Sequence, residues 1–239
     1  MIKNIKFNNN NELYSIISSS HVLSRGSEGT SYLVGKEVWK IFNELGKDQH
    51  SFRKIMKNHL LNIKSYAFIK GGIFASDELI GFYKPFVRGA SLRGYDLTTI
   101  PIKVLVSAAN KVCLDTETLS VHGIQTYDVG ETSILFDGHH FCMIKTIDYK
   151  SVNKDERSLY EYNIKSFSRI LFQNTITPNI RAYLEERPYL KKYIHDPYLL
   201  QTPGGFMMLV KQDVENRLQE EITTFKEAEK KLLLLPKKK

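Results

Sequence analysis

Two acidic residues, Asp128 and Asp148, stand where carboxylates could do chemistry. Asp128 lies in the stretch HGIQTYDVGETSILFD (122–137), between an apolar segment and a predicted strand, and Asp148 ends the apolar segment MIKTID. A carboxylate fixed on a short loop can accept the proton of an attacking hydroxyl, and a second one can hold a divalent metal. Alternatively, both Asp residues serve only to shape turns, because Asp and Gly commonly form the turns that connect strands.

A lysine and a glycine-containing turn form a second candidate set. The turn GSEG (26–29) lies between two predicted strands, and Lys40 follows in the strand VWKIF. Lys40 alternates with Val38 and Phe42, on the side of the strand that should face inward. A Lys among inward-facing apolar residues either extends to an edge or meets an anion. Lys36, at the end of a hairpin, is the alternative cation.

The elements that position Lys40 and its turn are mostly strands, from Val22 to about Val87. Two antiparallel pairs are predicted, Ser31–Val34 with Glu37–Phe42 around Gly35-Lys36, and Ile73-Phe74 with Glu78–Tyr83. One helix is expected from about Asp48 to Lys64, because its apolar residues recur at helical spacing. Pro85, in KPFVRGASL, ends the strand pattern.

Helical patterns dominate the rest of the chain. A buried helix is predicted from Pro101 to Leu119, and a short hairpin around Asp137-Gly138 has strands at Ser133–Phe136 and Met143–Ile147. Further helices are expected at Tyr160–Leu171, Tyr189–Ile194 and Gly205–Lys231. The fold class is therefore α+β, a small antiparallel β-rich region with one helix followed by a mainly helical region.

This order and these residues resemble the protein-kinase-like family, and its atypical bacterial members more than eukaryotic protein kinases. The stretch 122–137 aligns without gaps with the kinase catalytic loop, with Asp128 at the catalytic Asp and Ser133 at the Asn position five residues later. Asp148 takes the place of the first metal-binding Asp. The resemblance covers about residues 22–172 and implies a two-lobed kinase-like fold. Its parts are an N-terminal segment (1–21), an N-lobe with hinge (22–87), a helical C-lobe (88–225) and a basic tail (226–239).

The resemblance implies an ATP- and Mg²⁺-dependent phosphotransferase acting on a hydroxyl of a protein or small molecule. Lys40 would hold phosphates, Asp128 would serve as the base, and Asp148 with Ser133 would bind magnesium. The segment from Lys84 to Val87 would be the hinge that contacts adenine, although it also fits an ordinary interdomain link. The implied nucleotide contacts are Gly26, Ser27, Glu28, Gly29, Lys40, Lys84, Phe86 and Val87.

Several departures from the family pattern favour an alternative, an inactive pseudokinase that binds a nucleotide or a partner. The predicted helix 48–64 has no Glu to pair with Lys40, so either Glu44 substitutes or the ion pair is absent. Ser133 is a shorter ligand than Asn. Tyr149-Lys150 replace the Phe-Gly that follows the metal Asp, and only about ten residues separate Asp148 from the next helical pattern. Regulation by a long activation segment is therefore not expected.

Composition sets the remaining limits. The 239 residues are 42% hydrophobic, enough for one large domain or two lobes. The net charge of +8 is concentrated in the tail 226–239, which holds six Lys and two Glu, so a solvated end is favoured over a nucleic-acid partner. No apolar run has the length of a signal peptide core or a membrane span, so a cytoplasmic protein is expected. Cys113 and Cys142 are expected to be buried thiols.

Overall fold

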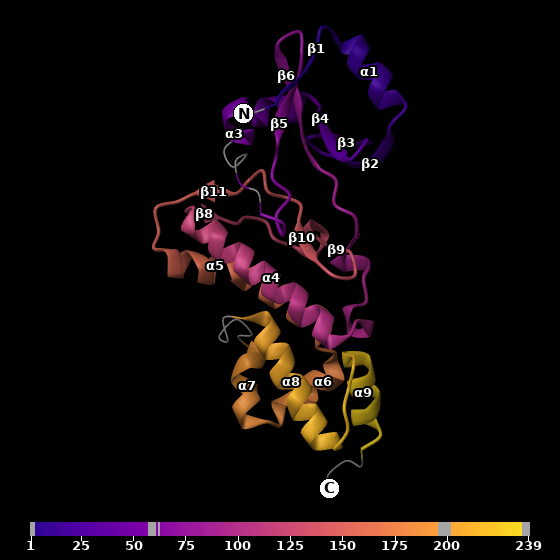
Figure 1. The fold of residues 1–239 in the computed structure, drawn as a ribbon, viewed down its shortest axis with the longest axis vertical. Helices are drawn as coiled ribbons and strands as arrows, with labels where there is room; N and C mark the ends of the chain where they lie inside the picture. Colours follow the sequence, from indigo (N-terminus) through magenta and orange to yellow (C-terminus); the bar gives the residue numbers. More distant parts are fainter. Residues whose placement is uncertain (1–2, 57–60, 62, 196–201, 236–239) are drawn as a thin grey trace. The chain divides into compact units, whose positions relative to one another are not determined.

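The computed structural model describes residues 3–56, 61, 63–195 and 202–235, which belong to two compact units. The first unit contains the chain up to Val87 together with Ile144–Ile147, and the second contains Arg88–Met143 and the chain from Asp148 onward. The first is built on a β-sheet, and the second is mainly helical with small sheets (Figure 1). The chain is therefore a mixed α and β protein.

The first unit contains a six-stranded sheet in the order β1-β5-β6-β4-β3-β2. The strands are β1 (Ile5–Phe7), β2 (His21–Gly26), β3 (Gly29–Val34), β4 (Glu37–Phe42), β5 (Gly71–Ala75) and β6 (Glu78–Pro85). Neighbours are antiparallel except for β1 and β5, which are parallel. The two antiparallel pairs predicted for this region are confirmed, because Val34 pairs with Glu37 and Ala75 pairs with Glu78. Two-residue turns of this kind need positive φ angles, which Gly35 (61°) and Ser76-Asp77 (49° and 63°) adopt.

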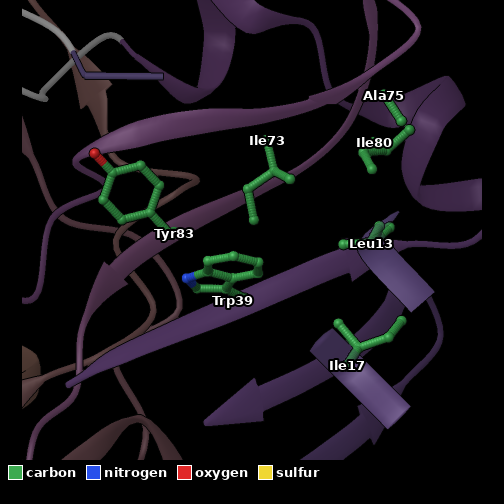
Figure 2. Packing of buried hydrophobic residues seen from close by; sticks show 7 residues of the cluster. All are labelled: Leu13, Ile17, Trp39, Ile73, Ala75, Ile80 and Tyr83. Carbon is green, nitrogen blue, oxygen red and sulfur yellow. The ribbon is translucent and has the colours of Figure 1, made fainter. Parts of the chain in front are cut away.

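One face of this sheet is covered by the helix α1 (Asn10–Ser18). Its buried residues Leu13 and Ile17 belong to one apolar cluster with Trp39, Ile73, Ala75, Ile80 and Tyr83 of the sheet (Figure 2). The side chain of Asn9 accepts the N–H groups of Asn11 and Glu12, at 3.0 and 3.2 Å, and so caps the helix. The segment 1–21, which the sequence sets apart, thus supplies a strand and a helix of the first unit.

A second apolar cluster involves the short helix α3 (Phe52–Ile55), which follows the short helix α2 (Glu44–Gln49). It contains Phe42, Ile55, Met56, Ile69 and Phe82. The single helix expected from Asp48 to Lys64 is wrong, because His50 is extended and the Ser51 side chain accepts the N–H of Lys54 at 3.3 Å and begins a new helix. Leu61 and Ile63 are not helical, and residues 57–60 and 62 lie outside the described part of the chain.

The second unit is organised around α4 (Ile102–Val121), whose residues Leu105, Ala108, Ala109 and Val112 are fully buried. This confirms the predicted helix. The other helices are α5 (Glu156–Thr175), α6 (Pro178–Glu185), α7 (Pro188–His195), α8 (Pro203–Leu218) and α9 (Phe225–Leu233), with one-turn helices η1 (Leu92–Gly94), η2 (Leu97–Thr99) and η3 (Glu131–Ser133). The strands are β7 (Ala90–Ser91), β8 (Ile124–Gln125), β9 (Ile134–Phe136), β10 (Phe141–Met143) and β11 (Lys150–Ser151). None of the described helices combines the length and the apolar character that crossing a membrane requires.

Two elements of the second half differ from the sequence prediction. The hairpin strand expected at 143–147 ends at Met143, because the next residues pack in the first unit, where the Thr146 hydroxyl donates to the Ala67 carbonyl at 2.9 Å. The long helix expected at 205–231 is divided into α8 and α9. Gln219 ends α8 in the left-handed conformation, with φ of 55°, and Thr224 caps α9 by accepting the N–H of Glu227 at 3.1 Å.

Candidate functional site

The loop that carries Asp128 is closed by Ser133. The buried Ser133 hydroxyl accepts the N–H of Gly130 at 2.7 Å, and it lies 2.8 Å from the Gly130 carbonyl and 3.3 Å from the Asp128 carbonyl. Asp128 has a φ of 50°, a left-handed conformation that Asp tolerates better than most residues, and its side chain is exposed. Ser133 therefore holds the loop in the shape that presents Asp128, and its role as a metal ligand stays a prediction.

The segment before Asp128 is held by Asn163, a buried residue of α5 that the sequence analysis did not identify. Its side-chain oxygen accepts the N–H of Thr126 at 2.8 Å. Its amide nitrogen donates to the Ile124 carbonyl at 2.8 Å and to the Ser120 hydroxyl at 3.2 Å. One side chain thus joins the end of α4, the strand β8 and the beginning of the loop. The sequence does contain a signal for Asn163, because it is a polar residue within the apolar stripe of the predicted helix, beside Ile164 and Phe167.

Asp148 is brought toward the same loop by the pairing of β8 with β11. The strands are antiparallel, with Gln125 opposite Lys150 and Ile124 opposite Ser151. The chain that leaves β8 toward Asp128 and the chain that arrives at β11 from Asp148 therefore lie at the same end of this small sheet. The Lys150 ammonium lies 5.3 Å from the centre of the Tyr127 ring, which agrees with this register. The second unit thus places the two acids predicted from the sequence at one end of β8 and β11.

In the first unit, the predicted Gly-containing turn is a tight two-residue turn. Gly26 pairs with Gly29, so Ser27 and Glu28 alone form its tip. Gly29 has a φ of 151°, and an added Cβ would collide with the Ile41 carbonyl of the neighbouring strand. A side chain is excluded there by both conformation and space.

Lys40 is paired with an acid of this turn. Its ammonium donates a hydrogen bond to the Glu28 carboxylate, and the two side chains keep 21% and 27% of their exposure. This pair lowers the pKa of Glu28, with the hydrogen bond from Lys40 as the largest cause. The sequence left open whether Glu44 or no acid pairs with Lys40. The structure shows Glu28 in this role, whereas Glu44 lies 3.8 Å from Lys47.

His50 lies on the other side of the same carboxylate. Its side chain is 1% exposed, and its ring stacks on Phe42 with centres 5.1 Å apart. Its Nε2 atom is 3.3 Å from the Glu28 oxygen that Lys40 binds, but neither ring nitrogen has a hydrogen-bond partner among the described residues. The contact between His50 and Glu28 is therefore one of distance and not an aligned hydrogen bond.

The segment Lys84–Val87, predicted to contact adenine, contains the last two residues of β6 and the two residues that follow. Lys84 pairs with Val38 in β4, and its ammonium donates to the Ile144 carbonyl. The Phe86 N–H donates to the Lys36 carbonyl at 3.0 Å, and the Phe86 side chain is 36% exposed. Because the Phe86 N–H is used within the sheet, adenine recognition along Lys84–Val87 would depend on other backbone groups.

The predicted residues thus form two sets, Gly26–Gly29 with Lys40 in the first unit and Asp128, Ser133 and Asp148 in the second. Across residues 3–56, 61, 63–195 and 202–235, no three His, Cys, Asp or Glu side chains gather in a way that could hold a metal. Magnesium bound with a nucleotide commonly uses only one or two carboxylates together with phosphate oxygens and waters, so the single carboxylate of Asp148 is compatible with its predicted role as a metal ligand.

Comparison with known proteins adds no assignment to this geometry. No known family model matches the sequence, and no curated protein matches it significantly.

Proposed function

We propose that the chain is an ATP- and Mg²⁺-dependent phosphotransferase acting on a hydroxyl group of a protein or small molecule, with a kinase-like fold. The observation that carries the proposal is the closed loop of Asp128, which starts from the strand that pairs with the segment after Asp148. The partly buried Lys40 supports it from the first unit, because a Lys held on a strand beside a glycine turn suits phosphate recognition.

Each candidate residue has one role in the proposed reaction. The acceptor oxygen attacks the γ-phosphorus of ATP, the bond from the γ-phosphorus to the β–γ bridging oxygen breaks, and ADP leaves. Asp128 accepts the proton of the acceptor hydroxyl, which requires a carboxylate held on a fixed loop. Asp148 would hold Mg²⁺, which neutralises charge on the phosphates when bound. Ser133 and Asn163 position the loop through the hydrogen bonds described above.

The alternative is a pseudokinase that binds a nucleotide or partner without transferring phosphate. Two observations favour it. Lys40 is already engaged by Glu28, and the Ser133 hydroxyl is used inside its own loop. A pseudokinase that binds a nucleotide shares the prediction of nucleotide binding with the enzyme, whereas one that binds only a partner does not. Only the enzyme predicts transfer that depends on Asp128.

Binding of Mg²⁺ and ATP to the wild type, Asp148→Asn and Glu161→Gln tests nucleotide binding, which the enzyme requires. A ligand at a hundredfold excess over its Kd stabilises the folded state by about 2.7 kcal/mol, which corresponds to a rise in Tm of roughly 5–10 °C for a chain of this size. We expect this rise in the wild type and in Glu161→Gln, a control that removes the same charge from an exposed pair with Arg157 on α5. Asp148→Asn should lose the Mg²⁺-dependent part. A wild type that shows no shift with ATP, with or without Mg²⁺, would contradict the proposal.

Transfer itself is tested by Asp128→Asn. Incubation with γ-labelled ATP and a panel of protein and small-molecule hydroxyl acceptors should label an acceptor with the wild type. The variant should retain nucleotide affinity and lose transfer, because the base acts in the transition state. Nucleotide binding with no transfer to any acceptor would favour the pseudokinase.

A further inference from the structure

We propose that Glu28 is an internal occupant of the anion site at Lys40, and that a phosphate-bearing ligand binds Lys40 by displacing the Glu28 side chain toward His50. The ligand class rests on the proposed function, whereas the internal occupancy rests on the geometry of the first unit alone. Glu28 would then control access to Lys40, which the family resemblance does not imply, since it places the partner of this Lys on the following helix.

One carboxylate oxygen of Glu28 lies close to two neighbouring side chains. The Lys40 ammonium is hydrogen bonded to Glu28 Oε2, and His50 Nε2 lies 3.3 Å from the same oxygen. Among the described residues, Glu28 is the only acid within ion-pair distance of Lys40. A carboxylate and a phosphate oxygen are both acceptors for an ammonium group, so an incoming phosphate competes directly with Glu28.

His50 can receive the displaced Glu28 carboxylate. The His50 ring is buried, and neither nitrogen has a hydrogen-bond partner among the described residues. A buried polar group without a partner is unfavourable, and an aligned hydrogen bond from His50 to Glu28 would remove this deficit. The pair that Glu28 loses with Lys40 is therefore compensated in part by one that it gains with His50.

The backbone of the Ser27-Glu28 turn is fixed by hydrogen bonds, so displacement requires only the Glu28 side chain to move. The Asn43 N–H donates to the Glu28 carbonyl at 3.0 Å, and the Asn43 side chain donates to the Ser27 carbonyl at 2.7 Å. Gly46 of α2 packs so closely on the Glu28 carbonyl that an added Cβ would collide with it. Displacement is therefore a rotation of the Glu28 side chain, and the turn need not open.

Occupancy is tested without a nucleotide by acylation of Lys40 with a water-soluble amine reagent, followed by mass spectrometry of the modified peptide. Glu28→Gln keeps the size of the side chain and removes its charge. Glu44→Gln is the matched control, because its carboxylate is 93% exposed at the start of the neighbouring helix and contacts Lys47 and not Lys40. We expect several-fold faster modification of Lys40 in Glu28→Gln than in the wild type and in Glu44→Gln. Equal rates in all three proteins would overturn the inference.

Displacement is tested by titrating the same proteins with Mg²⁺ and ATP, and with inorganic triphosphate, in a calorimeter. Loss of a charge-assisted competitor should tighten binding to Glu28→Gln by about tenfold, while Glu44→Gln binds as the wild type does. His50→Phe keeps a ring to stack on Phe42 but cannot receive Glu28, so it should bind several-fold more weakly than the wild type. Unchanged affinity in His50→Phe would remove His50 from the mechanism.

The two failures can be distinguished. If the wild type binds ATP and Glu28→Gln binds no more tightly, displacement is wrong and the proposed function stands. If Lys40 is modified faster in Glu28→Gln but no protein binds ATP or triphosphate, the proposed function fails. In that case Glu28 and Lys40 form a structural ion pair, and displacement by phosphate is overturned as well.

Discussion

Replacing Asn163 by Leu should destabilise the second unit and release the segment before Asp128. The substitution keeps the branched shape and the number of heavy atoms of the side chain in a site that is 2% exposed, and it removes three hydrogen bonds of 2.8, 2.8 and 3.2 Å. The N–H of Thr126 and the carbonyl of Ile124 would be left without these partners, and both residues are buried. At roughly 1–3 kcal/mol for each buried group without a partner, the loss of unfolding free energy is about 4 kcal/mol. For a unit of this size the Tm should fall by about 10 °C.

The control for this variant lies on the same helix. Ser168 is also 2% exposed, and its hydroxyl has no hydrogen-bond partner among the described residues. Ser168→Ala removes a buried polar atom that contributes no bond, so its stability should equal or exceed that of the wild type. Thermal and urea unfolding give the stabilities, and hydrogen exchange gives the protection of the Thr126 amide. An Asn163→Leu protein that melts as the wild type does, or that keeps full protection at Thr126, would refute the assignment of Asn163 as the anchor of this loop.

Three further predictions concern single groups. Gly46→Ala should destabilise the first unit in urea unfolding, because the new Cβ would collide with the Glu28 carbonyl. This loss should appear although Ala normally favours a helix over Gly by up to about 1 kcal/mol. Gly94→Ala, with open space around the added Cβ, should change the stability little. Burial raises the pKa of the Cys113 thiol to about 11, so a disulfide reagent at pH 8 should modify Cys113 slowly in the folded protein and rapidly in urea. The pKa of Glu28 is lowered by Lys40, so its stabilising contribution is complete above the ordinary carboxyl pKa of 4.5 and is lost as the pH falls through the lowered folded-state pKa. The difference in unfolding free energy between the wild type and Glu28→Gln should therefore shrink between pH 7 and pH 3, and a constant difference would contradict this linkage.

The elements that could be predicted from the sequence were those with a strong local signal. The hairpins at Gly35-Lys36 and at Ser76-Asp77 and the buried helix α4 follow from turn chemistry and apolar spacing, and the structure confirms them. The helix predicted at Asp48–Lys64 was wrong because the apolar spacing continues across Ser51, where a cap begins a new helix. The cap at Ser51 is a single hydrogen bond. It begins a new helix but leaves the spacing of the apolar residues unchanged, so this spacing does not reveal the break.

The end of β10 could not be predicted for a different reason. The segment after Met143 has the apolar character of a strand, but its partners, including Ala67, are distant in the chain. Local propensity carries no information about such contacts, and tertiary packing overrides it. The same limit applies to Asn163, whose polarity within an apolar stripe signals a buried bond but does not identify the partner.

The pairing register of β3 and β4 predicts part of the environment of Lys40. Once Val34 pairs with Glu37 across the predicted turn, Ser31 must pair with Lys40 and Gly29 with Phe42, and Glu28 must lie beside Asn43. The predicted hairpin therefore already placed Glu28 and Lys40 at the same end of β3 and β4. The following helix is expected to supply the partner of Lys40 only by family resemblance, and Glu28 lies before Lys40 in the chain. The strand register does not predict the direction in which the Glu28 side chain points. That direction depends on Gly46, which lets α2 approach the turn, and on the buried ring of His50, neither of which pairs with these strands.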